Sequence, residues 1–541
     1  MADPDRENTS KPHDPSPADD LPNGAHTDYP PHSVAVVGMA GRFPEADSVD
    51  ELWELLLEGK STVKRANEER LRLSQGGNSN NTIWWGNWLR DPEAFDHRFF
   101  KKSSREAVVW DPQQRILLEV VYEALESASY LGLSSAAEPN KNDYGKYHNL
   151  NTVGFLSPTG QCKPFDASAN GYCRAEGVAV VVLKELSAAI QDNDYIMGVI
   201  VGSATNQNHG VSHITLSNSD SLIDLYKKVL RLSNEKPESI TYVEAHGTGT
   251  TVGDPIEVRG IREAYGGPKR SFILHFVSIK VSGSTVVALI RKLAKATARV
   301  SGLIKVLLMM RHGKIPKPAS YSELNPKIPP LSPDKIAIPT TILPGNAPSH
   351  LACVNSHRAA GSNSAILVRE RPHLDTAAAS PSLKSYPLIL TTGSVNSLSS
   401  YAAKLLKRLR QAKVESTGRL ASLTFALADR ANHAVPYVFA TSVTNVLDLE
   451  FQLEGASSSS DITTVIDSKP VVLSEQSYDN RHFQINRASG TTSLVQLDPR
   501  QETQGHTSLS LQVRRAYAAL SLNYFQAAKL EASYITPRNL L

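Results

Sequence analysis

One segment near the middle of the chain constrains the fold more than any other. Residues 240–245 are an apolar, β-rich run typical of a strand, and a Gly/Thr loop follows from His246. Asp254 and Pro255 then occupy the N-cap and first-turn positions of a helix that we expect to end near residue 264. A strand, a loop and a capped helix in direct succession predict an α/β fold.

The rest of the ordered sequence repeats this alternation of strands and helices. Asp111 and Pro112 form a second helix start of the same kind, and the unbroken β-branched run at 178–183 predicts a strand buried on both faces. Strands are expected at 34–38, 178–183, 196–202, 272–279, 352–355 and 365–368, and helices at 48–57, 112–128, 219–232 and 301–312.

Composition excludes several classes of protein. The 541 residues carry 57 Lys and Arg against 54 Asp and Glu, and this net charge of +3 gives no reason to expect nucleic-acid binding. Three cysteines without a C-x-x-C pair exclude a disulfide scaffold and disfavour a cysteine-type zinc site. No apolar window of about 18 residues and no apolar leader are present, so we expect no membrane association and a cytoplasmic location.

The strand–loop–helix segment is also the best candidate for a functional site. His246 stands at the carboxyl end of a predicted strand, the edge at which α/β sheets bind ligands. The glycines that follow allow close approach to the backbone. Their spacing does not fit a dinucleotide-binding loop, because Gly253 comes one residue too late. A strained turn with a satisfied histidine is the alternative interpretation.

Several further sequence blocks, together with this segment, resemble a known protein family. Residues 241–255 resemble the histidine motif of β-ketoacyl synthase domains, specifically those of fungal iterative polyketide synthases of the non-reducing type. The matching blocks occur in the family's order between residues 33 and 371. They lie at 33–44, 84–87, 95–100, 111–118, 154–177, 302–316 and 325–328.

The resemblance implies a thiolase-like αβαβα fold that dimerises. It also implies decarboxylative Claisen condensation between an acyl group on a cysteine and a malonyl group on the phosphopantetheine of an acyl carrier protein, with no bound cofactor or metal of its own. By this carry-over His246 and Lys280 are catalytic, and Thr248 and Thr250 line the phosphopantetheine tunnel.

The nucleophile of the family has no counterpart in its expected interval. The family's cysteine motif precedes the block at 154, but residues 132–153 contain no cysteine. We infer an internal deletion near 146–153, which makes the fold incomplete and weakens the dimer. Cys162 and Cys173 come too late in the chain and are expected to be inert, while Cys353 is expected in the core.

The second histidine motif is altered as well. Lys280 matches the motif lysine, but 281–284 replace the Asn-Ile-Gly-His element that should follow it. Near the end of the domain, His357 and Arg358 replace the aromatic residue and the glycine of the family's gating loop, where an arginine is expected to strain the backbone.

Residues 264–322 contain no Asp or Glu. An out-of-frame or intron-derived stretch within this segment explains the lack of acidic residues most simply. The alternative is a basic amphipathic helix that binds an anionic membrane.

The domain organisation follows from these observations. Residues 1–32 are expected to be a disordered lead-in, 33–371 a β-ketoacyl synthase domain, 372–386 a linker, 387–455 a small α+β ketosynthase–acyltransferase linker domain, and 456–541 a broken acyltransferase start with an irregular tail. No G-x-S-x-G nucleophile motif is present.

The chain is therefore interpreted as a truncated polyketide synthase without condensing activity. A residual malonyl decarboxylase or acyl-carrier binder, a non-catalytic partner of an intact synthase, and a misfolded remnant are the alternatives.

Overall fold

The computed structural model describes the larger part of the chain. It covers residues 29–66, 85–128, 156–192, 194–209, 218–282, 297–345, 350–357, 361–372, 386–392, 394–412, 437–458 and 493–496, with a few positions between 420 and 428. Predictions for 1–28, 129–155, 283–296, 358–360, 459–492 and 497–541 lie outside the described residues, among them the proposed deletion, most of the basic helix, Arg358 and the acyltransferase start.

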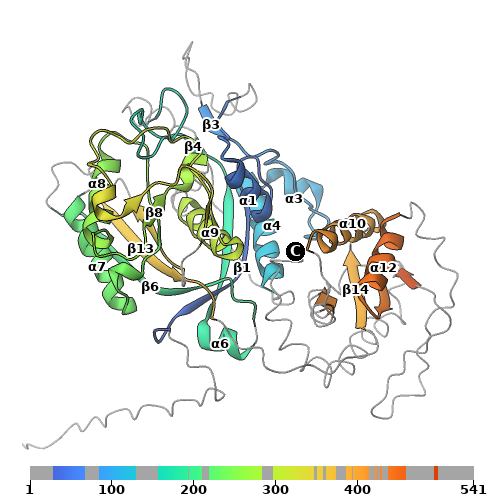
Figure 1. The fold of residues 1–541 in the computed structure, drawn as a ribbon. Coiled ribbons are helices and arrows are strands. Elements are labelled where there is room, and N and C mark those ends of the chain that lie inside the picture. The colour runs from blue at the N-terminus through green and yellow to red at the C-terminus, as the bar shows by residue number, and fades with distance from the viewer. Residues whose placement is uncertain are drawn as a thin grey trace, which may run out of the picture.

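An eight-stranded mixed sheet forms the centre of the larger of two units (Figure 1), with the strand order β10-β8-β7-β12-β13-β6-β1-β5. The strands β10, β8, β7 and β12 run parallel, and the pairs from β12 through to β5 are antiparallel. The strands are β1 (Val34–Arg42), β5 (Val178–Glu185), β6 (Gly198–Gln207), β7 (Tyr242–Glu244), β8 (Leu274–Val277), β10 (Ile336–Ala337), β12 (Leu351–His357) and β13 (Ser362–Arg369).

Helices cover both faces of this sheet. Apolar residues of α7 (Ser219–Ser233) and α8 (Gly253–Tyr265) pack into one core with β6, β7 and β13. Residues of α1 (Val49–Glu58) and α9 (Thr297–His312) form a second core that includes Val36 and Val354 of the sheet. The amphipathic α4 (Pro112–Ser127) covers β1 and β5. Burial of these apolar stripes is the main force that holds helices to sheet.

The remaining short elements lie in the connections of the larger unit. They are β2 (Lys64–Arg65), β3 (Trp85–Asn87), α3 (Ser104–Val109), β4 (Arg174–Ala175), α6 (Leu186–Gln191), η1 (Pro237–Ser239), η2 (Ile279–Ser282), β9 (Lys314–Ile315), η3 (Ser332–Asp334) and β11 (Leu343–Pro344). Strands β2, β3 and β4 form a small sheet, and β9 pairs with β11.

Helix starts that depend on local chemistry agree with the sequence. The Asp111 carboxylate accepts a hydrogen bond from the Gln113 N–H at the start of α4, with Pro112 in the first turn. Ser48 caps α1 through the Glu51 N–H. The predicted helix at 219–232 is confirmed as α7, and the one at 301–312 is confirmed as α9, which begins four residues earlier.

Two predictions from the sequence are wrong. Asp254 is not the N-cap of α8, because that helix begins at Gly253 and its N-cap is Val252. The Asp254 carboxylate instead binds loop N–H groups, as described below. The strand at 178–183 is not buried on both faces: among the described strands, β5 lies at one edge of the sheet beside β1, and Leu183 is 51% exposed.

The layering is simpler than the five layers that the resemblance implies. A five-layered αβαβα fold contains two sheets. Among the described residues, β1 pairs with both β5 and β6, so the strands form one sheet between two helical layers. This agrees with an incomplete version of the fold.

A second, smaller unit follows the sheet and has its own core. Strands β14 (Tyr386–Thr392), β15 (Tyr437–Val443) and β16 (Ser493–Gln496) pair antiparallel, and α10 (Val395–Ala412) packs against α12 (Val446–Ser458). Leucines from these elements form a separate hydrophobic cluster. In Figure 1 this unit lies beside the larger one, and Arg408 of α10 forms an ion pair of 3.2 Å with Asp50 of α1.

Within the described residues, no helix is both long and apolar enough to cross a lipid bilayer.

Candidate active site

His246 lies two residues beyond the carboxyl end of β7, at the edge of the sheet that the sequence predicted. Its side chain is held by the buried Lys280 of η2, whose Nζ donates to the imidazole Nδ1 at 2.8 Å and to the His246 carbonyl oxygen. Because an ammonium group has no lone pair, Nδ1 accepts and the ring proton resides on Nε2. Two side chains 34 residues apart in sequence, both predicted as site residues, are thus brought together.

The environment of Lys280 changes its proton affinity. Burial lowers the pKa of Lys280 to about 8, and the carboxylates of Glu257, Asp254 and Glu244 oppose this effect. The protonated form still predominates at neutral pH. A partly deprotonated lysine beside an imidazole is typical of functional sites.

Glu257 of α8 organises the backbone around His246. Its buried carboxylate accepts hydrogen bonds from the His246 N–H at 2.7 Å and the Gly247 N–H at 2.8 Å. Burial alone would raise the pKa of Glu257. The hydrogen bond and charge of the nearby His357, together with the two N–H groups, outweigh burial, so the pKa of Glu257 lies below its usual value. The sequence pattern predicted only a helix start here and gave no sign of this role for Glu257.

Asp254 fixes the glycine loop to a neighbouring loop. One carboxylate oxygen accepts from the Thr248 and Gly249 N–H groups at 3.1 Å, and the other accepts from the Phe165 N–H at 2.8 Å. Burial raises the pKa of Asp254 to about 7. Gly249 has a φ of +70°, and a Cβ there would lie 2.8 Å from the backbone nitrogen of Lys163. Only glycine therefore fits where the two loops approach each other.

The two threonines predicted to line a substrate tunnel lie side by side in this loop. Their hydroxyl oxygens are 3.1 Å apart, and Thr250 Oγ1 also accepts from the Gly253 N–H. Both side chains are half-buried. The hydroxyls therefore order the loop and the start of α8, and substrate contact by Thr248 and Thr250 stays a prediction.

All three cysteines of the chain are among the described residues, and none begins a helix. Burial raises the pKa of Cys173 and of Cys353 to about 12, so both stay protonated and poorly nucleophilic. Cys353 lies in the core within β12, as expected.

Cys162 is the cysteine nearest to the histidine site. Its buried Sγ lies 3.5 Å from the Thr248 carbonyl oxygen, and a thiolate at this position would raise the pKa of Lys280. It lies in an extended loop and therefore lacks the helix N-terminus that activates a catalytic thiol.

His357, at the carboxyl end of β12, lies next to His246. The two ring centroids are 5.3 Å apart, and the planes meet at 69°. In the sequence, His357 stood out only as a departure from the gating motif. The parallel pairing of β7 with β12 creates this proximity.

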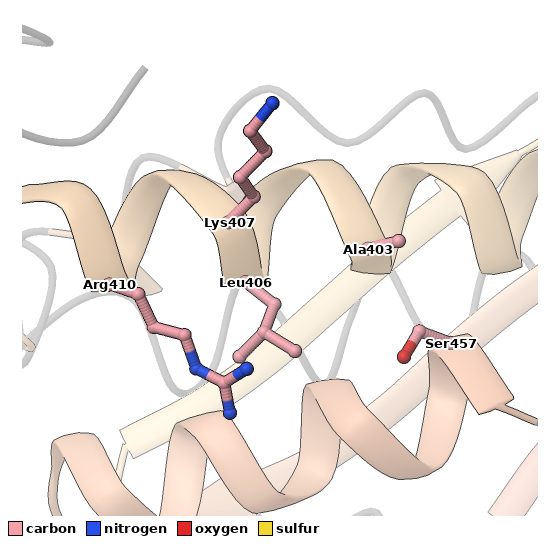
Figure 2. A pocket seen from close by; sticks show the side chains of 5 residues that line it. All are labelled: Ala403, Leu406, Lys407, Arg410 and Ser457. Atoms are coloured by element: carbon pink, nitrogen blue, oxygen red, sulfur yellow. The ribbon is translucent and has the colours of Figure 1, made fainter.

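The hollow shown in Figure 2 is a separate feature of the smaller unit. It lies between α10 and α12 and is lined by Ala403, Leu406, Lys407, Arg410 and Ser457. Arg410 forms ion pairs there with Glu450 and Glu454 of α12. Within the described part of the chain, no group of three or more His, Cys, Asp or Glu side chains is arranged to hold a metal ion.

Comparison with known families assigns the larger unit. A model of the β-ketoacyl synthase N-terminal domain matches residues 32–141 and 140–189, and a model of the β-ketoacyl synthase C-terminal domain matches 197–322. Together they cover more than half of the chain. The N-terminal match is in two pieces that meet at 140–141, within the interval where the nucleophile motif is missing.

Individual relatives agree with this family. The chain is 37% identical to methylphloroacetophenone synthase of Cladonia uncialis over 82% of its length, and 35% identical to the non-reducing polyketide synthase ausA of Penicillium brasilianum over 81%. It covers 21% of each, so it spans about a fifth of the length of these relatives.

Solved structures support the fold. The oxazolomycin ketosynthase domain OzmH KS7 of Streptomyces albus JA3453 superposes with a TM-score of 0.65 at 25% identity, covering 78% of this chain and 88% of that one. A ketosynthase from module 6 of the bacillaene synthase of Bacillus subtilis 168 gives 0.70 at 22% identity, covering 93% and 94%.

The chain therefore belongs to the β-ketoacyl synthase family and has the thiolase-like fold. More specifically, it carries a ketosynthase domain of the kind found in fungal non-reducing polyketide synthases, a family whose reaction is the condensation of acyl and malonyl thioesters.

Proposed function

We propose that this chain keeps the part of a ketosynthase site that holds a malonyl thioester, and that it has lost the part that holds the growing acyl chain. The His246–Lys280 contact of 2.8 Å supports the first half of the proposal, because a lysine-oriented imidazole is suited to bind a thioester oxygen.

One observation carries the second half: all three cysteines are placed, and none lies at a helix N-terminus. Covalent acyl transfer needs a thiolate, and a catalytic unit that loses its nucleophile loses nearly all of its rate. Cys173 and Cys353 are protonated thiols at neutral pH. The chain as it stands is therefore unable to form the carbon–carbon bond.

Acyl-enzyme trapping tests this proposal. The full chain is incubated with radiolabelled acetyl-pantetheine, denatured and analysed by mass spectrometry of peptides. We expect no thioester adduct on any cysteine. A stable adduct on Cys162 that is absent from the matched Cys162→Ser variant overturns the loss of the acyl-holding half, because Cys162 is the thiol near Lys280.

A binding measurement tests the retained half. Calorimetry with malonyl-pantetheine is expected to show binding by the native chain and a loss of at least about tenfold in His246→Ala. Equal affinity of the two proteins contradicts the role of His246.

We further propose the partners and organisation that family membership implies. The substrate arrives on the phosphopantetheine arm of an acyl carrier protein and passes Thr248 and Thr250, while the chain itself binds no cofactor. A homodimer is weakened by the deletion near 146–153, and the compartment is the cytoplasm. Residues 33–371 form the ketosynthase domain, 387–455 the linker domain, and 456–541 a broken acyltransferase start.

A further inference from the structure

Phe165 has a backbone conformation that a bulky residue seldom adopts. Its φ is +65°, in the left-handed region that favours glycine. Among the described non-glycine residues with a positive φ, Phe165 alone is buried, with 1% of its surface exposed. Strain of this kind persists only where surrounding contacts hold a residue in place, and it is found preferentially at functional sites. The contacts of Phe165 therefore indicate what the strained residue does.

Two hydrogen bonds hold the backbone of Phe165. Its N–H donates to the Asp254 carboxylate at 2.8 Å, and its carbonyl oxygen accepts from the Asn325 N–H at 2.8 Å. The same Asp254 carboxylate accepts from the Thr248 and Gly249 N–H groups. The left-handed residue is thus fixed to the Gly/Thr loop, which lies more than 80 residues later in the sequence.

The ring of Phe165 packs against both segments that carry the candidate site. A Cβ on Gly247 would lie 3.1 Å from the ring carbon Cζ, so the ring lies directly against the residue that follows His246. The ring also meets the ring of Phe276 edge-on, with 5.0 Å between the centroids. Phe276 belongs to β8, which leads into η2 and Lys280. One side chain therefore touches both segments whose side chains form the 2.8 Å contact of His246 with Lys280.

Gly247 makes this packing sensitive to the size of the side chain at position 165. Its φ of +37° and the 2.7 Å between a Cβ there and Ser278 Cβ keep this position a glycine. A shorter side chain at 165 would leave a space beside Gly247 that glycine cannot fill. The backbone of His246 and Gly247 would then gain room to shift relative to Lys280.

We propose that Phe165 is a positioning residue, whose left-handed backbone and ring hold the Gly/Thr loop so that the His246 imidazole faces Lys280. Phe165 acts through His246, which is half-buried. The consequence for binding rests on the proposed function, in which the oriented imidazole binds a malonyl thioester. The orientation itself exists in the ligand-free chain and is tested there.

Histidine resonances of the ligand-free full chain test the positioning. In chain labelled with ¹⁵N-histidine, with His246→Gln for assignment, we expect His246 in the Nε2–H tautomer, because Nδ1 accepts from Lys280. Phe165→Leu keeps an apolar side chain and removes the ring. We expect it to shift the His246 Nδ1 resonance, because the contact with Lys280 is weakened.

Phe43→Leu is the matched control for the loss of a buried ring. Phe43 is fully buried, directly follows β1, and belongs to the other core of the larger unit. Three strands separate β1 from β7 in the sheet. This variant should lower the melting temperature about as much as Phe165→Leu and leave the His246 resonances in place. Equal shifts in the two variants contradict the proposal, because they show an effect of general stability.

Calorimetry with malonyl-pantetheine measures the consequence for binding. We expect the affinity to fall about tenfold in Phe165→Leu and to change less than about twofold in Phe43→Leu. An unchanged His246 resonance in folded Phe165→Leu overturns the positioning role and leaves the proposed function intact. A native chain that does not bind malonyl-pantetheine overturns the proposed function, while the resonances still decide the positioning role.

A second variant keeps the test decisive if thermal unfolding shows that Phe165→Leu does not fold. Phe276→Leu removes the ring on which Phe165 packs and leaves Phe165 itself in place. We expect it to shift the His246 Nδ1 resonance in the ligand-free chain, and an unshifted resonance contradicts the proposal.

Discussion

At the scale of single residues, the buried ion pair of Glu244 and Lys305 joins the site strand to the helix behind it. Lys305 Nζ lies 2.8 Å from a Glu244 carboxylate oxygen, and both side chains are 2% exposed. The same carboxylate accepts from the Tyr242 hydroxyl at 2.8 Å and from the Ile279 N–H at 2.5 Å. Ile279 precedes Lys280, so this pair also supports the lysine of the site.

Loss of one partner is therefore expected to be costly. Lys305→Met leaves the Glu244 charge buried without a cation and should lower the free energy of unfolding by about 3–5 kcal/mol. The double change Glu244→Gln with Lys305→Met should recover part of this loss, because no buried charge remains. Arg259→Ala, in an exposed pair with Glu263, is the matched control and should leave the free energy of unfolding almost unchanged. Urea denaturation measures all three, and a cost for Lys305→Met as small as the control's contradicts this role.

Asp166 is a second residue whose charge is used structurally. Its carboxylate accepts from the N–H and hydroxyl of Ser168, from the N–H and hydroxyl of Ser322, and from the Glu323 N–H. Burial raises the pKa of Asp166, but these hydrogen bonds outweigh burial and hold the pKa below its usual value. The carboxylate thus binds the loop around Asp166, which lies beside the Gly/Thr loop after His246, to residues 322–323.

This shift has a defined pH signature. Because the folded-state pKa is lowered, the stabilisation is complete above the unfolded pKa near 4 and is lost as the pH falls through the folded value. Asp166→Asn should cost about 2–3 kcal/mol at pH 7, and the gap to the native chain should narrow below about pH 4. Denaturant unfolding at several pH values measures this gap; a gap that widens toward acid shows that the sign is wrong.

At the scale of elements, local chemistry and long-range pairing account for different parts of the structure. The starts of α1 and α4 were predictable, because Ser48 and Asp111 cap N–H groups within the next three residues. The same capping pattern gave a wrong prediction at Asp254, because N–H groups of two loops bind its carboxylate. One of these N–H groups belongs to Phe165, which is 89 residues away in sequence. A capping motif in the sequence cannot record such a distant competitor.

The candidate site shows the same division. The family resemblance assigned both His246 and Lys280, and the two side chains are in contact, while their catalytic role stays a prediction. Glu257 and His357 were missed as site residues, because their roles depend on the pairing of β7 with β12 and on the packing of α8 beneath both. The edge position of β5 was missed too, since an apolar run does not reveal how many neighbouring strands it has.

At the scale of the whole molecule, each of the two units of the described chain is stabilised by its own hydrophobic core. The sheet and its helices hold three clusters, while the unit of β14, β15, β16, α10 and α12 holds another with no residue in common. The Asp50–Arg408 pair between the units is 35% and 43% exposed, and a partly exposed ion pair contributes little. The two units should therefore unfold as separate cooperative transitions.

Matched core truncations test this independence. Leu405 of α10 and Leu307 of α9 are each 1% exposed, in the cores of the smaller and the larger unit. Each Leu→Ala change should cost about 2–5 kcal/mol. Leu405→Ala should lower one melting transition and leave the other in place, and Leu307→Ala should do the reverse, because each cavity opens in one core only. Differential scanning calorimetry of the full chain measures both, and a single transition that moves with either variant means that the two cores fold as one unit.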